Sequence, residues 1–112
     1  MVHSKRKGAG GERAAAAEIA RLFRTEARRG QQFSGSPDSP DIVTGLPNLH
    51  FEVKRCETLR LWTALDQAIA DAGSKVPVVL HRANHRPWIL IVRLDDVPRL
   101  CVDGYLQLAA IG

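Results

Sequence analysis

The sequence predicts a small α/β domain, in which helices and strands alternate along one chain. Residues 12–29 and 61–72 have the composition and spacing of helices, whereas residues 76–82 and 88–94 are apolar, β-branched runs that suit strands buried in a sheet. The 112 residues are 45% hydrophobic and 25% charged, which is typical of one globular domain and too apolar for a disordered chain.

The N-terminal part is expected to consist of a basic arm and a helix. Residues 1–11 are basic and contain glycines, a composition typical of a flexible segment. The run ERAAAAEIARLFRTEARR at residues 12–29 is rich in Ala, Arg and Glu, which favour a helix, and Gly30 stands where a C-terminal cap belongs. We therefore expect a flexible basic arm at residues 1–11 and a single domain at residues 12–112.

The middle of the chain predicts strands, turns and a second helix. The expected elements are a strand beginning at residues 31–33, a loop at 34–40, a short strand at 41–43, a turn at 44–48, a strand at 49–56 and a helix at 61–72. The loop, SGSPDSP, contains only turn-forming residues. In the helix, Trp62, Leu65 and Ile69 recur at helical spacing, and Gly73 follows its last residue.

The last third of the chain predicts two further strands and an ambiguous tail. Residues 83–87 can close a hairpin between the strands at 76–82 and 88–94. After Asp95, Pro98 and Gly104 interrupt any helix that forms.

Basic charge is concentrated in the N-terminal quarter of the chain. Residues 1–30 carry eight of the sixteen Lys and Arg residues but three of the twelve acidic residues. Such clustering is typical of a protein that binds a polyanion, although a solvated helix face gives the same pattern. No apolar run has the length needed to cross a bilayer, and Cys56 and Cys101 lie in no metal-binding motif. These features favour a reduced, cytosolic compartment.

The strand at residues 49–56, LHFEVKRC, carries charged residues on one face. Side chains alternate between the two faces of a strand, so an apolar face holds Leu49, Phe51 and Val53 and a polar face holds His50, Glu52, Lys54 and Cys56. If the short strand that begins at Asp41 pairs with this one, the carboxyl groups of Asp41 and Glu52 converge. Two carboxylates suit Mg²⁺, and a lysine beside them suits a phosphate or a water molecule. The alternative is an exposed salt bridge between Glu52 and Lys54.

The order of these residues is similar to a known nuclease motif. SPDIV followed by HFEVK resembles the PD-(D/E)XK motif, with Asp41, Glu52 and Lys54 in its three positions. The basic start, the glutamate that opens the first helix and the SGS loop before PDI resemble the archaeal-type Holliday junction resolvases and their phage-encoded relatives. The resemblance covers roughly residues 5–92. It implies a restriction-endonuclease-like fold, with a central mixed β-sheet flanked by helices, and two divalent metals in each active site.

The resemblance also implies how such a site hydrolyses phosphodiester bonds with Mg²⁺, for which Mn²⁺ can substitute. Asp41, Glu52 and the Val53 carbonyl would hold the metal, and Glu12 would complete its shell. Lys54 would orient or deprotonate the attacking water and stabilise charge in the transition state.

Three of the implied site residues have an alternative interpretation. Glu12 continues the apolar stripe of the first helix and so faces inward, yet a first-turn glutamate is also favoured by the helix dipole. Ser34 matches a serine important for strand cleavage, but it also suits a turn. Gln67 matches a helix-borne glutamine near the lysine, although helical spacing places it away from Leu65 and Ile69.

The implied substrate is a four-way DNA junction. DNA phosphates would be contacted by Lys5, Arg6, Lys7, Arg28, Arg29, Ser34 and Arg55. Two symmetric cuts need two sites, which implies a homodimer, with its contact supplied by apolar residues such as Trp88 or the segment 100–111. The expected setting is DNA recombination and repair in the cytoplasm of a bacterial or phage-infected cell, away from any membrane.

Two other functions stay open. The motif fixes the chemistry and not the substrate, so another nuclease of the same superfamily could act on flap, duplex or single-stranded DNA. In a second alternative, the acidic residues are structural and the chain is a non-catalytic module that binds nucleic acid.

Overall fold

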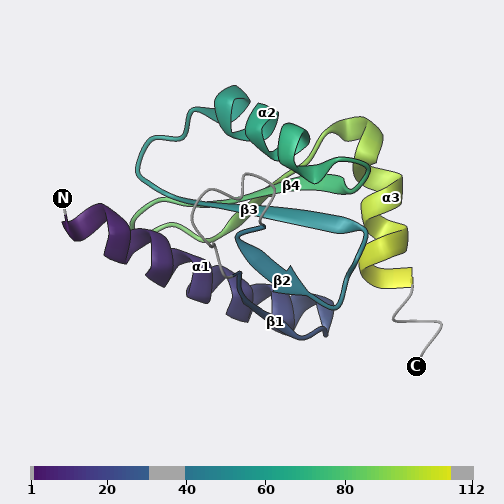
Figure 1. Cartoon of the computed structure of the whole chain (residues 1–112), viewed down its shortest axis with the longest axis horizontal. Coiled ribbons are helices and arrows are strands. Elements are labelled where there is room, and N and C mark those ends of the chain that lie inside the picture. The colour runs from purple at the N-terminus through teal and green to yellow at the C-terminus, as the bar shows by residue number, and fades with distance from the viewer. Residues whose placement is uncertain (1, 31–39, 107–112) are drawn as a thin grey trace.

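The centre of the molecule is a mixed sheet, shown in Figure 1. The computed structural model describes residues 2–30 and 40–106, with side chains from residue 10 onward. In chain order the elements are α1 (Val2–Phe23), β1 (Ala27–Arg29), β2 (Ile42–Thr44), β3 (Leu49–Arg55), α2 (Leu61–Ala72), β4 (Val76–Arg82), β5 (Ile89–Ile91), a 3₁₀ turn (Leu94–Asp96), α3 (Val97–Cys101) and a π-helical turn (Val102–Leu106).

Five strands of the described residues pair in the order β1-β2-β3-β4-β5. The pairs β1–β2, β2–β3 and β4–β5 are antiparallel, whereas β3 and β4 are parallel. Helix α1 covers one face of the sheet and α2 covers the other (Figure 1). The predicted α/β class, with a mixed sheet flanked by helices, is confirmed.

Residues 49–82 form the β3–α2–β4 unit, the most regular part of the fold. Parallel strands cannot be joined by a tight turn, and α2 supplies the crossover between them. Helix α2 ends at Ala72 and is followed by Gly73, which has φ +61°, a conformation that glycine adopts without strain. The predicted bounds of α2 and β4 are confirmed, and the predicted hairpin joins β4 to β5.

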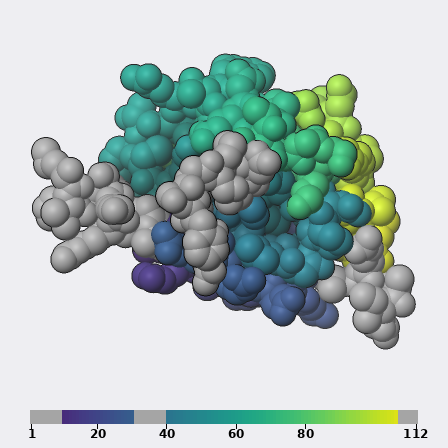
Figure 2. Space-filling view, viewed as in Figure 1, coloured from purple at the N-terminus to yellow at the C-terminus, as the bar shows by residue number. Residues whose placement is uncertain are grey.

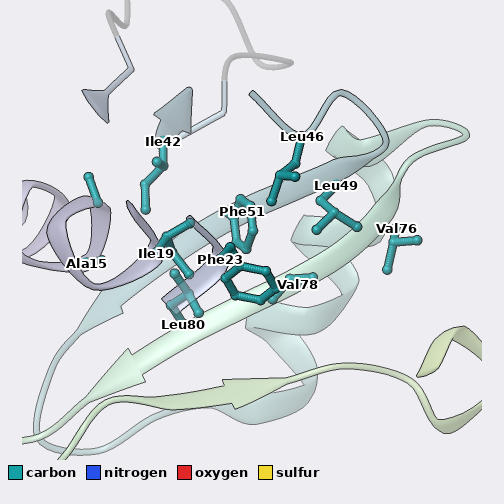
Figure 3. Packing of buried hydrophobic residues seen from close by; sticks show 11 residues of the cluster. Ala15, Ile19, Phe23, Ile42, Leu46, Leu49, Phe51, Val76, Val78 and Leu80 are labelled. Carbon is teal, nitrogen blue, oxygen red and sulfur yellow. The ribbon is translucent and has the colours of Figure 1, made fainter. Parts of the chain in front are cut away.

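The main hydrophobic core lies between α1 and the sheet (Figure 3). Side chains alternate between the two faces of a strand, so every second residue points toward α1, and these residues are apolar. The residues that meet there include Ala15, Ile19, Phe23, Ile42, Leu49, Phe51, Val78 and Leu80. A smaller cluster joins α2 to the other face and contains Ala64, Leu65, Ala68 and Val79. The predicted alternation along β3 is therefore confirmed, and its polar face points toward α2.

Helix α1 differs from the prediction at both ends. It begins at Val2 instead of residue 12, so the backbone of the expected flexible arm is helical. At the other end Arg24 has φ +50°, which breaks the helix, and Ala27–Arg29 pair with β2 as strand β1. Pairing with a neighbouring strand satisfies the backbone of Ala27–Arg29, and this outweighs their helix-favouring composition.

Gly30 is not the helix cap that the sequence predicts. It follows β1, and its backbone N–H donates to the Asp41 carbonyl over 2.8 Å. A Cβ atom at this position would lie 2.2 Å from the Pro40 carbonyl oxygen. Glycine is needed here because two backbone segments approach each other closely.

The remaining differences are at element boundaries. Strand β2 covers residues 42–44 instead of 41–43, and the last strand is limited to Ile89–Ile91. The described part of the ambiguous tail, up to residue 106, is helical, and the Tyr105 ring stacks on Phe23 with centroids 4.7 Å apart. The strand start at residues 31–33 and most of the loop at 34–40 lie outside the described residues. No helix in the described part of the chain is long and apolar enough to cross a membrane.

Candidate active site

Strands β2 and β3 bring Asp41 next to the middle of β3. The two strands pair through Ile42 and Phe51, and the Asp41 N–H donates to the Phe51 carbonyl over 3.2 Å. The side chain of Asp41 turns toward the same strand, where its Oδ2 accepts a hydrogen bond from the Val53 N–H over 2.7 Å. The sequence predicts that the carboxyl groups of Asp41 and Glu52 converge if their two strands are neighbours. The two strands are neighbours in the sheet.

Glu12 joins this group from α1. Its Oε1 accepts a hydrogen bond from Arg29 Nε over 2.6 Å, which links α1 to strand β1. Burial raises the pKa of Glu12, Arg29 opposes this shift, and the nearby Asp41 carboxyl group adds to it. The predicted inward orientation of Glu12 therefore places it beside Asp41.

Asp41 is the most strongly perturbed of these carboxyl groups. Burial raises the pKa of Asp41 to about 6; the Val53 N–H opposes the shift, and the negative charge of Glu52 adds to it. Carboxyl groups from α1, from the residue that precedes β2 and from β3 therefore meet in a partly desolvated position. Such a donor set fits a hard divalent cation such as Mg²⁺, which would neutralise their mutual repulsion.

Lys54 and Gln67 are also brought together. Lys54 follows Glu52 by two residues and so extends from the same face of β3. Its Nζ donates to Oε1 of Gln67 on α2 over 3.1 Å. The orientation of Gln67, which helical spacing leaves open, is therefore toward the lysine.

His50 and Asp71 lie on the other side of Glu52. His50 Nε2 is 2.9 Å from Glu52 Oε1, and both side chains are buried. Asp71, in the last turn of α2, is close to both of them. Sequence reasoning did not assign Asp71 to the site, although it follows Gln67 by four residues and therefore shares its helix face.

Three of the residues predicted to contact DNA have side chains that the structure describes, namely Arg28, Arg29 and Arg55. Arg28 is exposed on β1, whereas Arg29 is bound to Glu12. The guanidinium group of Arg55 donates to the Arg82 carbonyl and to Asn84 Oδ1, over 3.2 and 2.7 Å, and so supports the turn between β4 and β5. Ser34 lies outside the described residues. The backbone of Lys5, Arg6 and Lys7 belongs to α1.

The candidate site lies beneath α2 and next to the edge formed by β1 and β2. Figure 2 shows that α2 forms the upper part of this face of the molecule and that β1 and β2, in blue, border it below. Comparison of the chain with protein-family models, curated proteins and solved structures gave no match.

Proposed function

We propose that the chain is a metal-dependent, structure-selective DNA endonuclease with a restriction-endonuclease-like fold, acting as a Holliday junction resolvase. The observation that carries this proposal is the meeting of Glu12, Asp41 and Glu52, with Lys54 one pleat further along β3. Carboxylates together with a lysine on one strand are the residue types that metal-assisted hydrolysis of a phosphodiester requires.

The proposed metal ligands are three carboxyl groups and one backbone carbonyl. Asp41 and Glu52, with the Val53 carbonyl, would hold Mg²⁺, and Glu12 would complete the set. Bound Mg²⁺ supplies positive charge for the scissile phosphate and lowers the pKa of a water molecule. The Val53 N–H fixes the Asp41 carboxylate.

Lys54 would orient the attacking water as the ammonium ion, or take up its proton as the neutral amine. Its ammonium group is a compact charge with several donors, and the hydrogen bond to Gln67 limits its freedom. The same group can stabilise negative charge that develops on the phosphate oxygens. Gln67 therefore acts through Lys54 and is a positioning residue.

A four-way junction is the proposed substrate because the motif resembles that of the junction resolvases. Half of the Lys and Arg residues lie in residues 1–30, which supports DNA binding in general. Basic residues bind DNA phosphates without regard to sequence, and they give an affinity that falls steeply with salt. A homodimer would present two sites to the two symmetric strands of a junction.

Cleavage assays with defined DNA substrates test the proposal. Labelled junction, flap, duplex and single-stranded DNA are incubated with the protein, with and without Mg²⁺ or Mn²⁺. We expect paired symmetric nicks in the junction that require the metal, with linear duplex spared. Equal cleavage of flap or duplex would instead assign a different nuclease of this type, and binding without any cleavage would assign a non-catalytic module.

Point variants test the residue assignment. Asp41→Asn, Glu52→Gln and Lys54→Ala should each lower cleavage by about 100-fold or more while junction binding persists. Asp66→Asn, which removes an exposed carboxylate from α2, serves as the matched control and should cleave like the unmodified protein. Undiminished cleavage by Glu52→Gln would refute the assignment.

A further inference from the structure

A second group of metal-ligand side chains lies between β3 and α2. One ligand atom from each of His50, Glu52 and Asp71 lies within 4.8 Å of the other two. His50 Nε2 and Glu52 Oε1 are 2.9 Å apart, and these residues are only 2% and 4% exposed. Asp71 is half-buried, so the group has one side nearer to solvent.

The backbone holds these three residues in place. His50 and Glu52 are two residues apart on β3, which is paired with β2 on one side and β4 on the other. Asp71 belongs to the last turn of α2, and this helix is packed on the sheet through Leu65 and Ala68. The ligand atoms therefore project from rigid elements and not from a loop.

The donor set is that of a transition metal and differs from the all-oxygen set beside Asp41. Zn²⁺ binds imidazole nitrogen and carboxylate oxygen at about 2.0–2.2 Å, so two ligands in a tetrahedral site are about 3.4 Å apart. The direct contact between His50 and Glu52, at 2.9 Å, is shorter than that value, and all the ligand atoms of the group lie within 4.8 Å of one another, so small side-chain movements would admit the ion. Imidazole suits Zn²⁺, whereas Mg²⁺ prefers oxygen ligands and retains several waters.

We propose that His50, Glu52 and Asp71 form a Zn²⁺ site, in which water takes the fourth position. The ion would replace the direct hydrogen bond between His50 and Glu52 and would link the centre of the sheet to the last turn of α2. Glu52 is common to this site and to the proposed Mg²⁺ site, whereas His50 and Asp71 belong to the Zn²⁺ site alone. The proposal does not depend on nuclease activity, because Zn²⁺ binding is measured without DNA.

Zinc affinity measured by competition with a chromophoric chelator tests the site. The unmodified metal-free protein should bind Zn²⁺, and His50→Gln and Asp71→Asn should each weaken this binding by at least about tenfold. His85→Gln and Asp66→Asn, which remove an exposed histidine and an exposed carboxylate, are the matched controls and should retain the affinity. Cys101→Ser should also retain it, which excludes the exposed thiol as the ligand.

Two further measurements make the result decisive. X-ray absorption of the zinc complex should show a nitrogen and oxygen shell at about 2.0 Å and no sulfur ligand. Far-UV circular dichroism must show that Asp71→Asn is folded, and this variant decides the outcome if His50→Gln does not fold. Unchanged zinc affinity in folded Asp71→Asn, or a sulfur ligand in the spectrum, would overturn the proposal.

Asp41→Asn separates this inference from the proposed function. It should lower Mg²⁺-dependent cleavage by about 100-fold or more and retain Zn²⁺ binding. Zinc binding in a protein without nuclease activity would leave the Zn²⁺ site standing and refute the nuclease alone.

Discussion

The carboxyl group of Asp41 links the stability of the folded protein to pH. Its pKa is raised from 3.8 to about 6, mainly by burial, and the pKa of Glu12 shifts in the same direction. Between these two pH values the folded protein holds a proton on Asp41 that the unfolded chain has released. The free energy of unfolding therefore falls as pH rises through this window, by on the order of 2–3 kcal/mol, and Asp41 adds no further change at higher pH.

Urea unfolding in EDTA between about pH 4 and pH 8 measures this dependence. Asp41→Asn should remove most of the decrease and should be more stable than the unmodified protein near neutral pH. The exposed control Asp66→Asn should retain the decrease. If the free energy of unfolding of Asp41→Asn fell with pH as steeply as that of the control, this would contradict the burial of an ionisable Asp41.

Two glycines should respond in opposite ways to the same substitution. Gly30→Ala places a Cβ atom 2.2 Å from the Pro40 carbonyl oxygen, so the backbone that positions Asp41 must move. We expect a loss of about 2–4 kcal/mol in the free energy of unfolding. Gly10→Ala meets no atom within 4 Å inside α1 and should be neutral or stabilising by up to about 1 kcal/mol. Chemical denaturation compares the two, and equal effects would contradict the close approach at Gly30.

At the residue scale, a site residue can be predicted from the sequence where the periodicity of a strand or helix determines the direction of its side chain. Alternation along β3 is enough to group Glu52 with Lys54. The side chain of Gln67 could not be oriented in this way, because its direction depends on how α2 docks on the sheet. The meeting of Asp71 with His50 depends on the same docking, and short-range periodicity does not report it.

At the scale of elements, the ion pair between Arg29 and Glu12 attaches strand β1 to α1. Arg29→Ala should lower the free energy of unfolding by at most about 1 kcal/mol, because the arginine is partly exposed. Arg29 also opposes the raised pKa of Glu12, so its loss should raise that pKa further. Arg28→Ala, on the same strand and exposed, is the control. Urea unfolding and titration of Glu12 by NMR measure both effects, which should be absent from the control.

The boundaries of an element were predictable where a glycine or a β-branched run in the sequence marks the same residues at which the element begins or ends in the structure. Gly73 ends α2 at the expected residue, and the β-branched run at 76–82 is β4. The end of α1 was not predictable from composition, since the Ala- and Arg-rich sequence continues through Arg29. Strand β1 forms because β2 lies beside it, and β2 comes later in the chain.

At the scale of the whole molecule, the open edge of the sheet offers a contact for a second copy. Trp88, which the sequence suggests as a dimer contact, is half-buried against the core, whereas Ile89 and Leu90 on edge strand β5 are 50% and 38% exposed. We expect a homodimer in solution, and Ile89→Lys should weaken it because edge charges oppose strand pairing. Light scattering at micromolar concentration measures the mass. A monomer with undiminished junction cleavage would contradict the need for two sites.

The β3–α2–β4 unit also bears on the order of events during folding. It is one continuous segment, residues 49–82, and it contains His50, Glu52, Lys54, Gln67 and Asp71. Contacts between residues near in sequence form early, because closing a short loop costs less entropy. Glu12 and Asp41 come from outside this segment, so the acidic groups meet only when α1 and β2 dock. We expect repulsion between these groups to slow this docking above about pH 6, so Asp41→Asn should refold faster than the unmodified protein in stopped-flow experiments at neutral pH.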